Sequence, residues 1–318
     1  MRNAGRRVLV IFPGALGDLI CLAPALRAIS GANRGGSLEL IARGELVKLA
    51  LGRLGVDGGD SLDRREIAAL FTGPGRAYDA ARDLFRRYDR IHSFFAFDHE
   101  IFRRSLAHVS RADVSFHPFR PEGDGHISVR YLEAIGERSD VLENRIDLLD
   151  DDLSAAVRRL ARMGIEPGRY AIIFPGSGGA AKNWPLDRFV ALAGVLAGRL
   201  HPIFITGPAE NAIEPILRRS GFAFLNRLEL AEVAALAAMA AVFVGNDSGV
   251  SHLAAAAGAP GVAIFGPTDP AQWRPLGNAA VIRRQPLERL QVLEVAREAA
   301  RQCRSSLAAK PANLIRGL

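Results

Sequence analysis

Short apolar runs, each ending in a loop with Gly or Pro and followed by a segment with helical spacing, recur along this chain of 318 residues. The first unit has the run Val8 to Phe12, the loop Pro13-Gly14 and a helical pattern from Leu19 to Ile29. An apolar, β-branched run of this length predicts a buried strand, and an apolar period near 3.6 predicts a helix. Strands that alternate with helices predict an α/β protein with parallel sheets.

The alternation restarts in the second half, with a strand pattern from Tyr170 to Phe174 and a helical pattern from Leu186 to Leu200. A chain of this length commonly holds two domains, each with its own core. We therefore expect Rossmann-like domains over residues 1–163 and 170–318, joined by a linker over residues 164–169. Two doubly wound domains would face each other across a cleft, because open α/β sheets bind ligands at the carboxyl ends of their strands.

The chain is basic, with 41 Lys and Arg residues against 34 Asp and Glu residues and a formal charge of +7. Such a balance favours anionic partners, but it also fits a surface that only keeps the protein in solution. The charge does not separate a phosphate-rich substrate from a membrane surface, so both stay open here. Nucleic acid is disfavoured, because no aromatic platform or groove-reading motif accompanies the basic residues.

The cysteines and the N-terminus bear on the cellular compartment. Cys21 and Cys303 have no metal-ligand spacing and no disulfide framework, as expected in a reducing compartment. Arg6-Arg7 before an apolar run imitates a secretory signal, but Asp18 and nearby glycines interrupt that run. No apolar stretch is long enough to span a membrane. We expect a cytoplasmic protein with, at most, peripheral contact to the cytoplasmic face of the inner membrane.

The first loop that carries candidate chemistry runs from Gly14 to Asp18 and connects a strand to a helix. Free backbone N–H groups and the helix dipole favour negative charge there, and glycines such as Gly14 and Gly17 let another molecule approach the backbone. Asp18 has two interpretations at this point. It caps the helix, or it acts as a general base on a hydroxyl.

The second loop follows the strand that ends at Phe174 and contains Ser177 and, further on, Lys182. Small residues and a lysine point to a phosphate-binding loop. The stretch Gly176 to Ala181 also satisfies the dinucleotide fingerprint formally. We reject that match, because Trp184-Pro185 places the helix start near Leu186 and separates the fingerprint from the helix.

The third loop, Gly245 to Gly249, opens directly into a helix. Asp247 or Ser248 suits the N-cap position, and the backbone N–H groups that follow suit a pyrophosphate at the positive end of the helix dipole. His252, one turn on, is more typical of an orienting or core residue than of a catalyst. Elsewhere, Glu210 after a strand end is either a ligand for ribose hydroxyls or a surface-loop carboxylate. No His, Cys or carboxylate cluster has metal-ligand spacing.

Taken together and in order, these loops resemble the bacterial lipopolysaccharide heptosyltransferases of glycosyltransferase family 9, which use ADP-heptose. The residues that carry the resemblance are Gly17-Asp18, Pro175-Gly176-Ser177, Lys182, Trp184-Pro185, Gly245 to Gly249, His252 and Phe265 to Thr268. Each motif is weak alone, whereas the ordered set is specific and spans both halves. The resemblance implies the GT-B fold and an inverting, metal-independent transfer of heptose to a lipopolysaccharide core or a related anionic lipid-linked acceptor.

The resemblance also assigns roles to residues. It implies that Asp18 is the general base, that Ser177 and Lys182 hold the donor phosphates, and that Asp247 binds hydroxyls of the donor sugar. It further implies that Ser248 and Gly249 offer backbone amides to the pyrophosphate. Fixed dipoles and a cation would then stabilise the leaving diphosphate, so that no metal or other cofactor is required.

Some assignments stay open. The ribose-binding acid aligns with Glu210 or Glu214, and we name Glu210. The stretch between about residues 113 and 145 matches no assigned motif, so the acceptor is not identified. A transferase with another nucleotide sugar and a non-catalytic nucleotide-sugar-binding protein both remain alternatives, because phosphate-binding loops alone do not specify the sugar.

Overall fold

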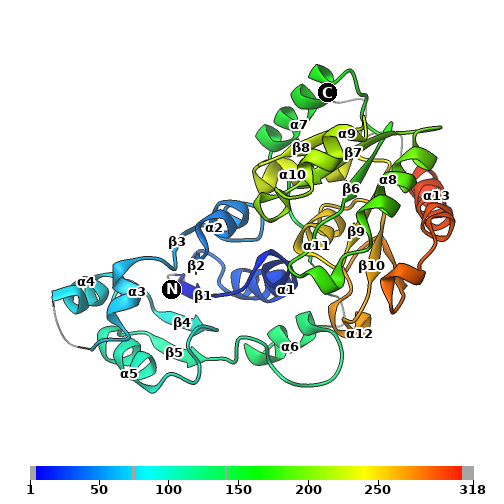
Figure 1. Ribbon diagram of the computed structural model, residues 1–318. Helices are drawn as coiled ribbons and strands as arrows, with labels where there is room; N and C mark the ends of the chain where they lie inside the picture. Colours follow the sequence, from blue (N-terminus) through cyan, green and yellow to red (C-terminus); the bar gives the residue numbers. More distant parts are fainter. Residues whose placement is uncertain (1–4, 74–75, 140–141, 143, 310–318) are drawn as a thin grey trace. The chain divides into compact units, whose positions relative to one another are not determined.

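The computed structural model describes residues 5–73, 76–139, 142 and 144–309. Contacts divide the chain into two compact units, Met1–Asp147 and Leu148–Leu318. Each unit has its own parallel sheet with helices on both faces, as Figure 1 shows for each unit. The predicted α/β class and the two-part organisation are confirmed.

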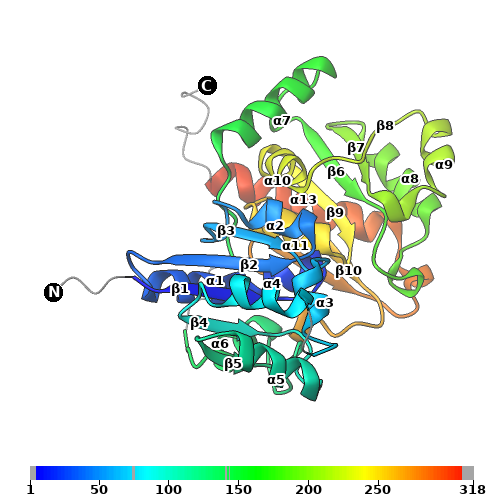
Figure 2. The same cartoon turned by 90° about the vertical axis from the view of Figure 1, so that its left-hand side faces the viewer.

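The first unit consists of β1 (Arg7–Ile11), α1 (Leu16–Ala32), β2 (Ser37–Ala42), α2 (Gly44–Ala50), β3 (Gly58–Ser61), α3 (Arg65–Ala69), α4 (Arg76–Phe85), β4 (Arg90–Ser93), α5 (Glu100–Val109), β5 (Asp113–Phe116) and α6 (Ile127–Ala134). The sheet has the order β3-β2-β1-β4-β5, and all its pairs are parallel (Figure 2). The strand carboxyl ends therefore meet at one edge.

The core of this unit follows from the alternation of side chains along β1. Leu9 and Ile11 pack on one face with buried residues of α3, α4 and α5. Residues of the other parity point to the opposite face, where Phe12 contacts Tyr131 of α6 with ring centroids 5.8 Å apart. α6 in turn packs against α1. Burial on both faces explains why β1 is almost wholly apolar.

The second unit consists of α7 (Asp150–Arg162), β6 (Tyr170–Phe174), η1 (Ala180–Lys182), α8 (Leu186–Leu196), β7 (His201–Thr206), η2 (Pro208–Glu210), α9 (Glu214–Arg219), β8 (Ala223–Asn226), α10 (Leu230–Met239), β9 (Val242–Asn246), α11 (Gly249–Ala256), β10 (Gly261–Phe265), α12 (Pro270–Trp273), β11 (Ala279–Arg283), η3 (Leu287–Arg289) and α13 (Val292–Ala309). The sheet order is β11-β10-β9-β6-β7-β8, and all pairs are parallel.

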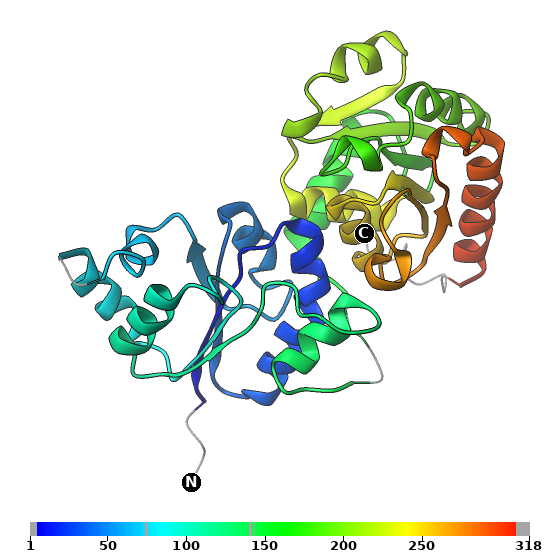
Figure 3. The same cartoon turned by 60° about the horizontal axis from the view of Figure 1, so that its bottom comes forward.

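Helices cover both faces of this second sheet. Buried residues of α8, α9 and α13 form one hydrophobic cluster with β6, β9 and β10. α13 is the red helix beside β10 and β11 in Figure 3. On the other face α10 packs against both α7 and α11. Every residue of β6, β9 and β10 is buried, which their continuous apolar runs predict.

The boundary between the units differs from the predicted one. The predicted linker at residues 164–169 instead lies inside the second unit, as the connection between α7 and β6. The physical reason is that α7 packs against α10 and that Arg159 forms an ion pair with Glu232. α7 therefore belongs to the C-terminal unit, although it precedes that unit's first strand.

The sequence patterns do not reveal β3, β5, β8 or β11, and all four are edge strands of their sheets. Their residues are mostly intermediate in burial or exposed, in contrast to the buried central strands. An edge strand needs no continuous apolar run, so it gives no strong sequence signal. α13 is likewise not predicted from the sequence patterns.

Candidate functional site

In the first unit, the turn after β1 places Asp18 in the first turn of α1. The carboxylate is 6% exposed, and its Oδ2 accepts a hydrogen bond of 3.1 Å from the backbone N–H of Ala15. The capping interpretation of Asp18 is thus confirmed. Gly14 is required there, because a Cβ at this position would lie 2.7 Å from the Cβ of Asp18. Gly17 is the second residue of α1.

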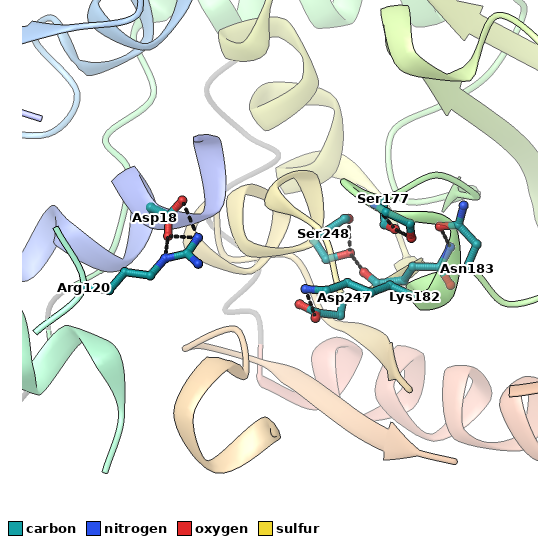
Figure 4. Close-up of polar contacts among 10 residues, drawn as sticks. Asp18, Arg120, Ser177, Lys182, Asn183, Asp247 and Ser248 are labelled. Atoms are coloured by element: carbon teal, nitrogen blue, oxygen red, sulfur yellow. Dashed lines mark hydrogen bonds and ion pairs between the residues drawn. The ribbon is translucent and has the colours of Figure 1, made fainter. Parts of the chain in front are cut away.

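The other oxygen of the Asp18 carboxylate is held by Arg120 (Figure 4). The Nη2 and Nε of Arg120 donate to Oδ1 at 3.1 and 3.3 Å. Arg120 follows β5, so two strand-end loops of one sheet supply the pair. Arg120 was not predicted as a site residue, because it lies in the stretch 113–145, which matches no assigned motif. Residues 140–141 and 143 of that stretch lie outside the described part of the chain.

A cluster of aromatic rings packs beside the Asp18–Arg120 pair and includes Phe119, the residue before Arg120. Phe12 contacts Phe94 and Phe119, with ring centroids 5.9 and 5.7 Å apart. Tyr131 of α6 packs on the same ring and donates a hydrogen bond of 3.1 Å to the carbonyl oxygen of Phe119. Burial, together with the charge of Asp18, raises the pKa of Tyr131 well above its ordinary value, so the hydroxyl stays protonated. The backbone just before Arg120 is therefore fixed.

In the second unit, the side chain of Lys182, in the loop after β6, lies next to the loop after β9. The Nζ of Lys182 lies 2.7 Å from Oδ2 of Asp247, and the carboxylate of Asp247 is almost wholly buried (Figure 4). Ser177 lies earlier in the loop, where its Oγ donates to the carbonyl oxygen of Gly179 at 2.8 Å. α8 begins at Leu186, so the dinucleotide fingerprint is separated from the helix as expected.

Asn246, the last residue of β9, ties these two loops together. Its side chain is fully buried, donates to the carbonyl oxygen of Pro175 at 2.8 Å and accepts from the backbone N–H of Trp184 at 2.9 Å. One amide thus holds both ends of the loop that contains Lys182. Asn246 belongs to the predicted Gly245 to Gly249 loop, but no role was predicted for it, because a polar residue at a strand end does not indicate which residues it contacts.

The N-terminus of α11 presents unsatisfied donors. Ser248 is the N-cap, and the backbone N–H groups of Ser248, Gly249 and Val250 have no hydrogen-bond acceptor among the described residues. Such groups at a helix N-terminus form an anion-binding site. His252 is 4% exposed, which agrees with its interpretation as an orienting or core residue.

A hollow of about 400 Å³ adjoins the β6 loop and is lined by that loop and by η2. Glu210 lies in its wall and accepts a hydrogen bond of 2.7 Å from the backbone N–H of Gly207. Its carboxylate also lies against Gly176, where an added Cβ would be 2.1 Å from Oε1. Gly176 therefore needs to be glycine. Glu210 thus packs against the loop that contains Ser177.

Two further features concern metals and membranes. Within the described part of the chain, no group of three or more His, Cys, Asp or Glu side chains is arranged to hold a metal ion. Among the same residues, no helix has both the length and the apolar character needed to cross a bilayer.

The family model of glycosyltransferase family 9 (heptosyltransferase) matches residues 117–300, more than half of the chain. The chain belongs to this family. The match includes Arg120 and every predicted site residue of the second unit, whereas Asp18 lies outside the matched range.

Individual heptosyltransferases match over stretches of different length. Lipopolysaccharide heptosyltransferase 1 of Escherichia coli K12 is 32% identical over 143 residues, which cover 44% of this chain and 45% of that protein. Lipopolysaccharide heptosyltransferase 3 of the same strain is 27% identical over 56% of this chain and 52% of that protein. Lipooligosaccharide heptosyltransferase 2 of Campylobacter jejuni is 24% identical over 86% of this chain and 85% of that protein. The first two alignments thus span only about half of those relatives.

Solved structures of the family share the fold over nearly the whole chain. A glycosyl transferase of family 9 from Veillonella parvula superposes with a TM-score of 0.79 at 18% identity, covering 96% of this chain and 99% of that one. The ADP-heptose LPS heptosyltransferase II of Escherichia coli superposes with a TM-score of 0.74 at 19% identity, covering 95% and 99%. The GT-B fold, the family and the heptosyltransferase resemblance are confirmed.

Proposed function

We propose that this family 9 protein is an inverting glycosyltransferase that moves a heptose from ADP-heptose to a lipopolysaccharide core or a related anionic lipid-linked saccharide. The observation that carries the proposal is the Lys182–Asp247 pair next to the unsatisfied N–H groups of α11. A cation beside backbone N–H donors at a helix N-terminus is suited to a diphosphate, which supports the proposal. A solved heptosyltransferase structure of the family, WaaC of Escherichia coli, was determined with ADP.

On the donor side, the amides of Ser248 and Gly249 would bind the pyrophosphate, assisted by Lys182 and Ser177. The ammonium group of Lys182 has three protons, so it donates to Asp247 and still has donors for a phosphate oxygen. Asp247 would use its remaining acceptor capacity for hydroxyl groups of the donor sugar. Glu210, in the wall of the adjoining hollow, would accept hydrogen bonds from the ribose.

In the transfer step, a carboxylate oxygen of Asp18 takes the proton of an acceptor hydroxyl, and the hydroxyl oxygen attacks the anomeric carbon of the donor. The bond between that carbon and the phosphate oxygen breaks, and its electron pair leaves with ADP. Configuration at the carbon inverts, because attack and departure occur on opposite sides. Arg120 balances the charge of the buried carboxylate and keeps it in place.

The charge on the departing ADP would be met by Lys182 and the α11 N-terminus, so we propose that the reaction uses no metal or other cofactor. We also propose that it occurs in the cytoplasm. A lipid-linked acceptor is held at a membrane, and the basic chain would meet it by peripheral contact with the inner membrane.

Calorimetric titration with ADP, UDP, GDP and NAD tests the proposal. We expect selective binding of ADP, and we expect Lys182→Ala to weaken it by about 1.5 to 3 kcal/mol through loss of a charge-assisted contact. Lys48→Ala, which removes an exposed lysine on α2, is the matched control and should leave ADP affinity unchanged. Preference for another nucleotide diphosphate would replace the donor, and binding of NAD alone would overturn the transferase assignment.

A further inference from the structure

A hollow of about 530 Å³ lies in the first unit at the amino edge of its sheet, where the strands begin. Its lining comes from the start of β1, the end of α1, the start of β4 and the turn after α6. Asp18 and Asn33, which lines the hollow, are separated by nearly the whole of α1, about 20 Å at a rise of 1.5 Å per residue. The hollow is therefore separate from the site that contains Asp18.

Three arginines line this hollow, namely Arg6, Arg34 and Arg90. Arg6 and Arg34 are exposed, and neither forms an ion pair with another described residue. The Nε of Arg90 is buried and makes no hydrogen bond within the described part of the chain, and the nearest oxygen of Asp113 is 3.9 Å away. Because a guanidinium has five N–H donors, all three side chains have donors to offer a ligand.

A buried imidazole adds a further polar group to the lining. His92 is 4% exposed, and its Nδ1 lies 3.1 Å from Nε2 of His117. The other ring nitrogen of His92 has no hydrogen-bond partner among the described residues. Burial lowers the pKa of His92 to about 4, so the ring is neutral near pH 7 and offers a hydrogen bond without a charge.

The wall of the hollow at the end of α1 is fixed by backbone contacts. The side chain of Asn33 donates to the carbonyl oxygen of Arg6 at 2.7 Å and accepts from the backbone N–H of Arg6 at 3.0 Å. Gly35 has φ of +82°, and a Cβ added to Gly36 would lie 2.2 Å from the carbonyl oxygen of Arg6. The backbone that carries Arg6 and Arg34 is thus held in place without a ligand.

Two features of the lining oppose an anion. Glu137 contributes a carboxylate, and α1 and α6 both end at the hollow, where each helix C-terminus adds about half a negative charge. Three guanidinium groups and one carboxylate give a formal charge of +2, which the helix ends reduce to about +1. The balance therefore favours an anion over a cation.

We propose that this hollow binds a phosphate monoester with a small polyol body, and that the guanidinium groups of Arg34 and Arg90 hold the phosphate. A phosphate monoester carries nearly two negative charges at neutral pH, and its oxygens match the N–H fork of arginine. Val8, Ile29 and Ile135 provide apolar wall for the carbon atoms of the polyol. A lipid headgroup and a soluble ester share this chemistry. Binding here does not depend on the proposed transfer reaction, which uses none of these residues.

The test is NMR of protein that is isotopically labelled in its histidine rings and titrated with glycerol 3-phosphate. We expect a saturable shift of the His92 signals, which are assigned by their loss in His92→Gln. Arg34→Gln and Arg90→Gln each remove one guanidinium group, so each should weaken binding about 10-fold. Arg34 lies in an exposed turn, so its variant keeps the test valid even if Arg90→Gln does not fold.

Arg86→Gln is the matched control, because Arg86 is an exposed arginine of the same unit that does not line the hollow. It should bind glycerol 3-phosphate as the unchanged protein does. Glycerol, and sodium chloride at matched ionic strength, should leave the His92 signals in place. An equal shift with the salt, the absence of a saturable shift, or equal affinity of all variants would overturn the proposal.

Sedimentation with phosphatidylcholine vesicles that contain phosphatidic acid, whose headgroup is a phosphate monoester, separates the two sources of the ligand. Vesicle binding that glycerol 3-phosphate displaces and Arg34→Gln weakens would assign the hollow to a lipid headgroup. A saturable shift of His92 with glycerol 3-phosphate, without such vesicle binding, would assign it to a soluble ester.

Discussion

The loops after β1 and β6 occupy equivalent places in two sheets of related strand order, yet they provide opposite chemistry. In each sheet the first strand in the chain sits beside the strand at which the order reverses, β4 in one unit and β9 in the other. The β1 loop leads at once into α1 and buries a carboxylate, Asp18. The β6 loop is longer, rich in glycine, and delivers a cation, Lys182.

A second difference lies in the backbone donors at two helix N-termini, that of α1 after β1 and that of α11 after β9. In the first unit, Asp18 itself accepts the amide of Ala15, so the positive end of the α1 dipole is already balanced by an internal anion. In the second unit, no side chain of the described residues accepts from the first amides of α11. One topology therefore gives a buried, internally capped carboxylate in one unit and a helix N-terminus without a side-chain cap in the other.

Asp18→Asn has the largest expected effect and tests whether the two units have separate roles. The amide keeps the size of the side chain but cannot take a proton, so turnover should fall by about 10² to 10⁴. ADP affinity, which depends on the other unit, should stay within error. Steady-state kinetics and calorimetry on the same protein separate the two effects. Undiminished turnover would remove Asp18 from the mechanism.

Asn246→Ala tests whether the second unit's site depends on the hydrogen bonds by which Asn246 holds the loop after β6. The substitution leaves the buried carbonyl of Pro175 and the N–H of Trp184 without partners, which should cost about 2 to 3 kcal/mol of unfolding free energy. Denaturation followed by tryptophan fluorescence reports this unit, because both tryptophans, Trp184 and Trp273, lie in it. Asn211→Ala, at an exposed loop position, is the control. Equal stability of the two variants would show that the hydrogen bonds of Asn246 do not stabilise the second unit.

The first unit should respond to acid through its buried histidine pair. The Nδ1 of His92 lies 3.1 Å from Nε2 of His117, and burial lowers the pKa of each to about 4, with the neighbouring ring as a further cause for His92. Because the folded pKa lies below the unfolded value of about 6.5, protons bind the unfolded chain first. Stability is thus complete above pH 6.5 and falls between pH 6.5 and 4, by on the order of 2 kcal/mol.

Hydrogen exchange in peptides from β4 and β5 measures that loss in the unit that contains the pair. His117→Gln removes one titrating group and should reduce the pH dependence by about half. His201, exposed in the second unit, provides the control variant His201→Gln. A pH dependence that His117→Gln leaves unchanged would show that other groups are responsible.

The smallest expected effect concerns the support of Arg120. Tyr131→Phe removes the hydrogen bond to the carbonyl of Phe119 but keeps the packed ring, so it should cost about 0.5 to 1.5 kcal/mol. Turnover should fall modestly while ADP affinity does not change. Tyr170→Phe, which removes a buried tyrosine hydroxyl in the second unit, is the matched control. If both variants lower turnover equally, Tyr131 has no particular role in positioning.

The sequence predicts those parts of the fold that are buried on both faces. The strand from Tyr170 to Phe174 is confirmed with its predicted bounds. The edge strands and the true unit boundary were not predictable in this way. Half-exposed strands lack a continuous apolar run, and the assignment of α7 depends on packing against α10, which is distant in sequence.

The residues of the site also differ in whether local sequence patterns could predict them. Residues within one loop, such as Asp18 and Ser248, are found from local patterns because strand, loop and helix follow directly in the chain. Arg120 reaches Asp18 across 102 positions of sequence, and Asn246 reaches Pro175 across 71. Such pairings depend on which strands are neighbours in the sheet, and a local sequence motif does not determine the order of the strands.

The position of the boundary between Asp147 and Leu148 has an evolutionary consequence. Every strand pair lies within one unit, and each of the two hydrophobic clusters described above lies within one unit. A recombination event at that point would exchange one half of the gene and leave the core of the other half intact. Related genes can thus trade the half that carries Asp18 and Arg120 separately from the half that carries Lys182, so the two sites can be recombined by shuffling as well as altered by point mutation.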